Sequence, residues 1–224
     1  MKVKKTVFFL TVAAFFAVFP AKASFVTVKS VDAPEKFALY DEPKAGPTAV
    51  FYDAANEPVG LKNFAGKIVL VNVWSTACSQ CVVELPMLDA LQKSFGTVRF
   101  VVVPLSVGGE TPGAVTRFFI QKQFKNLRAY VDKNAAFSMA AGVTGLPTTL
   151  LFDARGREIG RIRGIAEWTG PVVKAQIRSL IKAEIERQKE EKKQREAAAT
   201  TPIPLIDEKN DLPSPADVSG WFKK

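Results

Sequence analysis

The sequence contains two cysteines, Cys78 and Cys81, which stand two residues apart directly after an apolar run. That run, residues 68–73, predicts a buried strand, and the apolar spacing beyond the second cysteine predicts a helix. A strand that ends in Cys-x-x-Cys and continues into a helix places Cys78 at the helix N-terminus. Unpaired amide groups and the helix dipole favour the thiolate there. Cys81 lies one turn further on, within reach of a disulfide with Cys78. The pattern therefore indicates a redox-active cysteine pair.

Two other interpretations of the cysteines are weaker. A structural disulfide between Cys78 and Cys81 would close a loop too short to constrain much of the unfolded chain. A structural zinc site needs four ligands, and the sequence contains no histidine. We therefore expect neither a metal site nor a bound cofactor.

The N-terminus reads as a secretory signal peptide spanning residues 1–23. Three lysines precede an uncharged apolar stretch, residues 7–19, and Ala21-Lys22-Ala23 gives a small-x-small cleavage site before Ser24. The stretch is short for a membrane span, which needs roughly 20 residues. Either cleavage or an uncleaved membrane anchor exports the folded part, so we expect a periplasmic location.

The charge of the chain gives little evidence for a nucleic-acid partner. The formal net charge is +9, but four of the lysines lie within residues 1–23. No cluster of basic and aromatic residues stands out as a nucleic-acid surface. We therefore expect no nucleic-acid binding.

The remaining pattern predicts a single α/β domain over residues 47–181. A polar lead-in, residues 24–46, carries no assignable element. The expected elements are an N-terminal hairpin (49–52 and 59–61), strands at 67–73 and 98–105, a helix capped by Thr111 with Pro112 first, a short strand at 127–131, a brief helix capped by Asn134, a hairpin (148–152 and 159–163) and a last helix from about Trp168. This order predicts a mixed central sheet with helices on both faces.

Residues 182–224 are expected to form a charged and flexible C-terminal extension. Residues 184–196 are nearly all charged, which is typical of either a solvated helix or the start of disorder. Residues 201–224 contain four prolines and little periodicity, which favours a flexible tail.

Two motifs carry a resemblance to a known family. The first runs from 69–74 into Cys78-Ser79-Gln80-Cys81 and Glu84-Leu85-Pro86, and the second is Gly142-Val143-Thr144-Gly145-Leu146-Pro147-Thr148-Thr149. Together they resemble the thioredoxin superfamily, and within it the exported TlpA/ResA-type thiol–disulfide oxidoreductases. The sequence departs from that family at two positions: Gln80 replaces the usual proline and Ala77 the usual tryptophan.

The resemblance implies a thioredoxin-like fold and a protein thiol–disulfide oxidoreductase that reduces disulfides in exported proteins. It implies that Cys78 attacks the substrate disulfide and that Cys81 resolves the mixed disulfide. A membrane thiol-transfer protein would supply electrons, and cytochrome c biogenesis is a common task of the family. Two alternatives remain: an oxidant or isomerase of the same fold, and a thioredoxin-like binding module with an idle disulfide.

The resemblance also assigns roles around the cysteines. Glu84 either influences cysteine ionisation or is an ordinary acid of the first helical turn. Pro147 is expected to be cis, rather than a trans proline at a strand edge, and with Leu146 to bind extended substrate. Trp74 either contacts the substrate or packs in the core and in the wall of the site, and Asn72 is expected to be a buried hydrogen-bonding residue.

Overall fold

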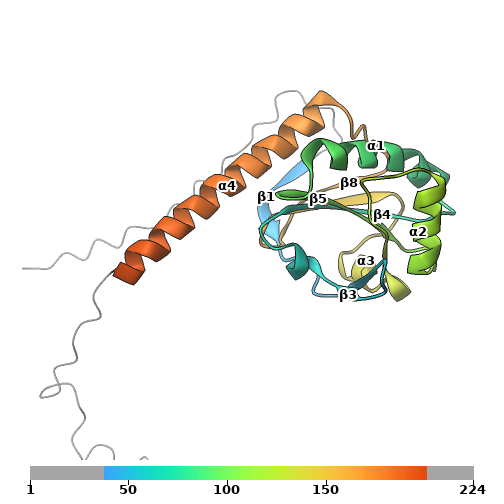
Figure 1. Ribbon diagram of the computed structural model, residues 1–224, viewed down its shortest axis with the longest axis horizontal. Coiled ribbons are helices and arrows are strands. Elements are labelled where there is room, and N and C mark those ends of the chain that lie inside the picture. Colours follow the sequence, from blue (N-terminus) through green and yellow to red (C-terminus); the bar gives the residue numbers. More distant parts are fainter. Residues whose placement is uncertain (1–37, 201–224) are drawn as a thin grey trace, which may run out of the picture.

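The computed structural model describes residues 38–200 (Figure 1). The expected signal peptide, the first part of the lead-in and the proline-containing tail, residues 201–224, lie outside these residues. The strands are β1 (Ala38–Lys44), β2 (Phe51–Asp53), β3 (Pro58–Val59), β4 (Ile68–Trp74), β5 (Phe100–Ser106), β6 (Tyr130–Val131), β7 (Thr148–Phe152) and β8 (Glu158–Arg163). The helices are η1 (Leu61–Phe64), α1 (Ser79–Phe95), α2 (Pro112–Gln121), η2 (Lys133–Ala135), α3 (Ala136–Ala140) and α4 (Pro171–Thr200).

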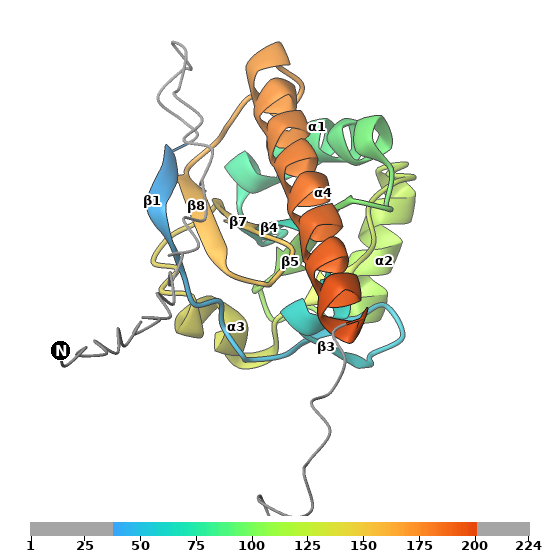
Figure 2. The same cartoon turned by 90° about the vertical axis from the view of Figure 1, so that its left-hand side faces the viewer.

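The strands form one mixed sheet in the order β1-β8-β7-β4-β5-β6-β2-β3. β4 runs parallel to β5 and antiparallel to β7, and every residue of β4 is buried because both faces of the sheet are covered. Helices α1, α2 and α4 contribute to the core on one face, and α3 packs with the β2–β3 hairpin on the other (Figure 2). The predicted α/β class, with a mixed central sheet and helices on both faces, is confirmed.

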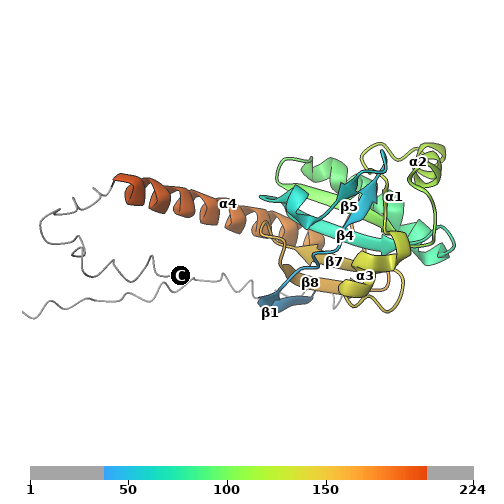
Figure 3. The ribbon, with the colours of Figure 1, turned by 90° about the horizontal axis from the view of Figure 1, so that it is seen from below.

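The N-terminal part of the domain adds two features to the sheet. Phe51 pairs with Val59 in the β2–β3 hairpin, as predicted. The unassigned lead-in contributes β1, which pairs antiparallel with β8 at the edge of the sheet (Figure 3). The folded domain therefore includes part of the segment that the sequence pattern left unassigned.

Two predicted helix caps have different outcomes. Thr111 caps α2, with its hydroxyl 3.2 Å from the amide of Ala114, as predicted. The prediction that Asn134 caps the next helix is wrong, because Asn134 has a left-handed backbone with φ of 58°. The carboxylate of Asp132 instead accepts from the amides of Phe137 and Ser138, at 2.9 and 2.8 Å. A side-chain acceptor at this position satisfies two amides of the first turn of α3.

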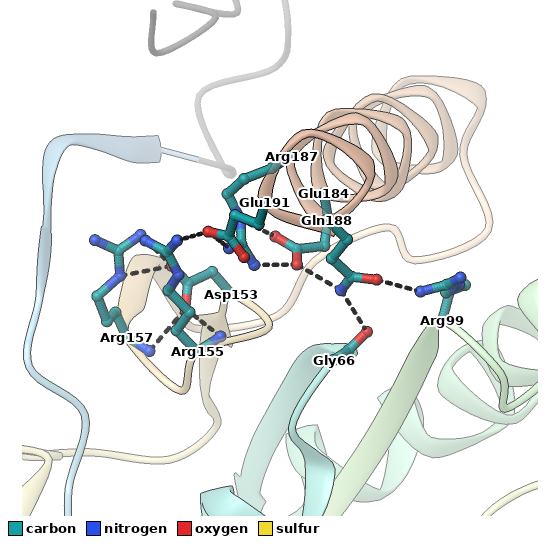
Figure 4. Close-up of polar contacts among 9 residues, drawn as sticks. All are labelled: Gly66, Arg99, Asp153, Arg155, Arg157, Glu184, Arg187, Gln188 and Glu191. Atoms are coloured by element: carbon teal, nitrogen blue, oxygen red, sulfur yellow. Dashed lines mark hydrogen bonds and ion pairs between the residues drawn. The ribbon is translucent and has the colours of Figure 1, made fainter. Parts of the chain in front are cut away.

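Helix α4 continues past residue 181 to Thr200, so residues 182–200 are helical, one of the two alternatives that their charge pattern allowed. Its middle part contacts the end of the sheet at which β4 and β5 begin (Figure 4). Gln188 accepts from Arg99 and lies 3.4 Å from the carbonyl oxygen of Gly66, while Glu191 pairs with Arg155. Among residues 38–200, the helices lack an apolar stretch long enough to cross a membrane.

Candidate active site

The predicted cysteine pair lies where β4 ends and α1 begins. Cys78 is the N-cap of α1, and its Sγ accepts from the amide of Cys81 at 3.2 Å. The two sulfurs are joined in a disulfide. Cys78 is partly exposed, whereas Cys81 is fully buried. The sulfur at the helix N-terminus is therefore the one that a substrate can reach.

The loop from Ser75 to Cys78 is held by its own backbone and by one serine. The buried side chain of Ser75 accepts from the amide of Ala77 at 3.2 Å, and the carbonyl of Ser75 accepts from the amide of Cys78 at 3.1 Å. These contacts form a turn that brings the chain from the end of β4 into α1. Cys78 is thus placed by a turn and not by an extended segment.

Glu110 also contacts this loop, and the sequence analysis missed it. One carboxylate oxygen accepts from the amide of Thr76 at 3.0 Å and from its hydroxyl, and the other accepts from Ser106 at 2.6 Å. Burial alone raises the pKa of Glu110, but the hydrogen bonds from Ser106 and Thr76 outweigh it, so the pKa lies below its ordinary value. A sequence signal existed: the C-terminal ends of parallel strands share one edge of a sheet, and Glu110 follows the strand parallel to β4.

Glu84 lies in the core, on α1 and three residues beyond Cys81. Its carboxylate accepts from the amide of Ala166 at 2.7 Å and from the indole of Trp168 at 2.9 Å. The side-chain amide of Asn72 lies 3.4 Å from its other oxygen and donates to Thr149 at 2.9 Å. Glu84 therefore links α1 to the segment that precedes α4, and Asn72 is the buried hydrogen-bonding residue that was expected.

The second motif lies next to the first, because β7, which follows it, pairs with β4. The Leu146–Pro147 peptide bond is cis, as predicted. β7 begins at Thr148, which pairs with Val73 of β4, so Pro147 lies beside the loop that carries Cys78. Pro147 is buried and its carbonyl accepts from Gly164 at 2.9 Å, whereas Leu146 is partly exposed.

Trp74 does not fit a role in substrate binding. Its side chain is fully buried, and its rings lie 5.5 Å from Phe118 and 5.7 Å from Phe119 between centroids. Residues 68, 70, 72 and 74 of β4 point to the face that α1 and α2 cover, which places this indole inside the core. Packing, the other interpretation of Trp74, is what the structure shows.

The site consists of two sulfurs, with Glu110 hydrogen-bonded to the loop that carries Cys78 and Glu84 three residues beyond Cys81 on α1. Within residues 38–200, no group of three or more histidine, cysteine, aspartate or glutamate side chains could hold a metal ion. Cys78 and Cys81 can exchange two electrons with a substrate dithiol or disulfide through thiolate attack. The arrangement provides an accessible sulfur, a buried second sulfur and, in the segment before β7, the partly exposed Leu146.

Comparison with known proteins agrees with this geometry. The Redoxin family model matches residues 42–177, more than half of the chain. The thiol-disulfide oxidoreductase ResA of Bacillus thuringiensis subsp. konkukian (strain 97-27) is 32% identical over 121 residues, which cover 54% of this chain and 69% of the relative.

Two solved structures share the fold at 22% identity and a TM-score of 0.51. One is the pneumococcal exposed lipoprotein thioredoxin from Streptococcus pneumoniae strain TIGR4, for which the match covers 58% of this chain and 98% of that chain. The other is a thiol:disulfide interchange protein of the thioredoxin family from Chlorobium tepidum TLS, with 63% and 99% covered. The predicted thioredoxin-like fold is confirmed.

Proposed function

Because this chain belongs to the Redoxin family and is a thiol–disulfide oxidoreductase, we propose that it is exported and reduces disulfides in extracytoplasmic proteins through Cys78 and Cys81. The observation that carries the proposal is the unequal exposure of the two sulfurs. Cys78 is accessible at the start of α1, while Cys81 is buried one turn behind it. This asymmetry suits one attacking thiol and one resolving thiol.

The reaction conserves two electrons. The Cys78 thiolate attacks one sulfur of the substrate disulfide, and the other substrate sulfur leaves as a thiolate that takes up a proton. Cys81 then attacks the Cys78 sulfur and expels the second substrate thiolate. The substrate has gained two electrons, and the enzyme holds the disulfide that the structure shows. A membrane thiol-transfer protein is the proposed electron donor that reduces this disulfide again.

In this proposal Leu146 and Pro147 act on the substrate, and Glu84 acts on the sulfurs. Leu146 pairs with extended substrate through its backbone, because Pro147 has no amide hydrogen and its carbonyl already accepts from Gly164. Glu84 acts on the cysteines from one helical turn away, where buried donors fix its carboxylate. Pro147 shapes the surface that the substrate meets.

The test is reduction of insulin, followed by measurement of the reduction potential. We expect wild-type protein to reduce insulin with dithiothreitol as donor and Cys78→Ser to lose this activity. The direction of the reaction depends on the potential: a reductant lies near the roughly −270 mV of thioredoxin, and an oxidant near the roughly −120 mV of DsbA. A value at the oxidant end would overturn the reducing role and favour the oxidant or isomerase alternative.

Substrates are identified by trapping. Cys81→Ala lacks the resolving thiol, so mixed disulfides with Cys78 should accumulate and can be identified by mass spectrometry. Apocytochrome c among the trapped proteins would support a role in cytochrome c biogenesis. Without Cys81, the substrate cannot be released by the second step.

Export rests on the N-terminal sequence together with the exposed lipoprotein that shares the fold. The lysines, the apolar stretch and the cleavage site of residues 1–23 favour a periplasmic location, with membrane anchoring if the signal stays uncleaved. We expect the mature protein in the periplasmic fraction to begin at Ser24. Recovery of full-length protein from the cytoplasm would contradict export.

A further inference from the structure

The Glu110 carboxylate joins the ends of two neighbouring parallel strands at the active site. Ser106, the last residue of β5, donates to one oxygen at 2.6 Å, and Thr76, two residues beyond β4, donates its amide to the other at 3.0 Å. The Thr76 hydroxyl donates to the same oxygen as the amide. Three donors thus converge on a carboxylate that is itself partly buried.

Gly108 shows how closely this contact is packed. A Cβ at Gly108 would lie 2.5 Å from the hydroxyl oxygen of Ser75 and 2.6 Å from both carboxylate oxygens of Glu110. These distances are too short for real contacts, so any side chain here must displace Glu110 or Ser75. Glycine at this position therefore leaves the space that the carboxylate occupies.

We propose that Glu110 is a positioning residue for Cys78, holding the loop 75–78 in the geometry that closes the disulfide with Cys81. The amide of Cys78 donates to the carbonyl of Ser75, so a shift of the intervening Thr76 passes directly to the reactive sulfur. The hydrogen bonds from Ser106 and Thr76 keep the pKa of Glu110 below its ordinary value, so the carboxylate is ionised and a strong acceptor at neutral pH.

The negative charge of Glu110 is a separate effect. A carboxylate near Cys78 opposes the thiolate and so stabilises the disulfide over the reduced pair. Glu110→Gln removes the charge and keeps the size of the side chain. Gly108→Ala displaces the carboxylate of Glu110 or the hydroxyl of Ser75, both of which hold the loop, and keeps the charge. The two variants therefore separate position from charge.

The experiment measures the reduction potential of the Cys78–Cys81 pair and kcat/KM for insulin in the full chain. Gly108→Ala and Glu110→Gln are compared with wild type and with Glu57→Gln, a control in the exposed β2–β3 turn. If the loop 75–78 becomes more mobile, the effective concentration of the Cys78 thiol near the Cys81 thiol falls. We expect both test variants to weaken the disulfide about tenfold, which is about 30 mV toward more oxidising values.

We also expect kcat/KM to fall at least about tenfold, since misplacing a reacting group by about 1 Å can cost 10²-fold. Glu57→Gln should match wild type. Thr76→Val removes one donor to Glu110, and its effect on kcat/KM should not add to that of Glu110→Gln, because both act through one contact. The comparison of Thr76→Val with Glu110→Gln tests the proposal even if Gly108→Ala fails to fold.

The outcomes separate the two proposals. The inference rests on the proposed redox role of the cysteine pair, and wild-type protein without a titratable disulfide would overturn both. A wild-type disulfide that titrates, together with folded Gly108→Ala and Glu110→Gln proteins of unchanged potential, would overturn the role of Glu110 alone. A shift in Glu110→Gln but not in folded Gly108→Ala would leave only an effect of charge, which also overturns positioning.

Discussion

Cys78 and Cys81 have the same chemistry but different surroundings, and their surroundings decide their roles. Cys78 is an N-cap with partial exposure, and the amide of Cys81 points at its sulfur. Cys81 has no exposed surface. A thiolate at Cys78 gains from the helix N-terminus, whereas a thiolate at Cys81 would lose its hydration.

Alkylation of the reduced protein tests these roles. We expect iodoacetamide to modify Cys78 first, with half-maximal rate below about pH 8.5, the value for a free thiol. The Cys81→Ala variant should keep this fast phase and Cys78→Ala should lose it. Faster modification of Cys81 would reverse the assignment of attacking and resolving thiols.

The lowered pKa of Glu110 gives a second prediction, for acidic solution. The unfolded carboxyl has an ordinary pKa of 4.5, and the folded value lies below it because of the hydrogen bonds from Ser106 and Thr76. The stability that these contacts contribute is therefore fully present above about pH 4.5 and is lost as the pH falls through the folded value. The Thr76 amide resonance should titrate below pH 4.5 in wild type and not in Glu110→Gln. A midpoint above 4.5 would contradict the contact.

Among individual residues, the sequence predicted the roles of those that belong to a local sequence motif. Cys78, Cys81 and Pro147 stand within short motifs, so their positions could be identified directly. Glu110 contacts the loop only because β4 and β5 pair in parallel, a relation that no local motif contains. Trp74 was ambiguous because a residue at a strand end can point into the core or toward the site.

Among the elements, β1 shows what sequence periodicity misses. The strand contains Pro43 and several charged residues, and it lacks the strict alternation that indicates a half-buried strand. Its partner β8 supplies the pairing, and an edge strand tolerates proline. Sequence spacing also missed the role of Asp132 at the start of α3. Its carboxylate reaches amides five and six residues further on, which depends on the three-dimensional path of the chain. The strands β4 and β5 were predictable because their apolar runs are long. The strands β7 and β8 were predictable because they flank a short turn, residues 153–156, as a hairpin does.

A partly buried polar cluster joins β1 to β8. Tyr40 donates to Glu158 at 2.7 Å and accepts from Arg161 at 2.9 Å. Burial and the Glu158 carboxylate raise the pKa of Tyr40, so its hydroxyl remains a neutral donor. Arg161 also donates to the carbonyl of Ala141 at 2.9 Å, at the end of α3 and before the Pro147 loop. The lead-in strand is thus connected, through Arg161, to the chain segment that leads from α3 to Pro147.

Tyr40→Phe tests this connection. Loss of a hydroxyl that serves two charged partners should destabilise the fold by about 1–3 kcal/mol. The measurement is urea unfolding, in which the midpoint should fall without a change in the m-value. Tyr52→Phe, on β2 near the opposite edge of the sheet, is the matched control. Equal midpoints for the two variants would show that the β1 cluster contributes little.

For the whole molecule, the cysteine pair and the contacts of α4 lie at opposite ends of the central strands. The cysteines follow the C-terminal end of β4, whereas α4 contacts residues that precede β4 and β5, together with the β7–β8 turn (Figure 4). Beyond these contacts α4 projects away from the sheet (Figures 1 and 3). The composition of residues 182–200 indicated charge but could not indicate that Gln188 and Glu191 meet the domain.

This separation predicts the effect of truncation. A protein ending at residue 183 lacks the contacts of Gln188 and Glu191, most of them between partly exposed side chains. Such contacts stabilise weakly, so we expect Tm to fall by about 5 °C or less. Insulin reduction should stay at the wild-type rate, because the loop 75–78 and Pro147 lie at the other end of the sheet. A protein ending at residue 200 is the control and should match the full chain in both measurements. Loss of turnover in the shorter protein at a temperature where it is folded would mean that α4 influences the cysteines, most directly through Glu84 and its contact with Trp168.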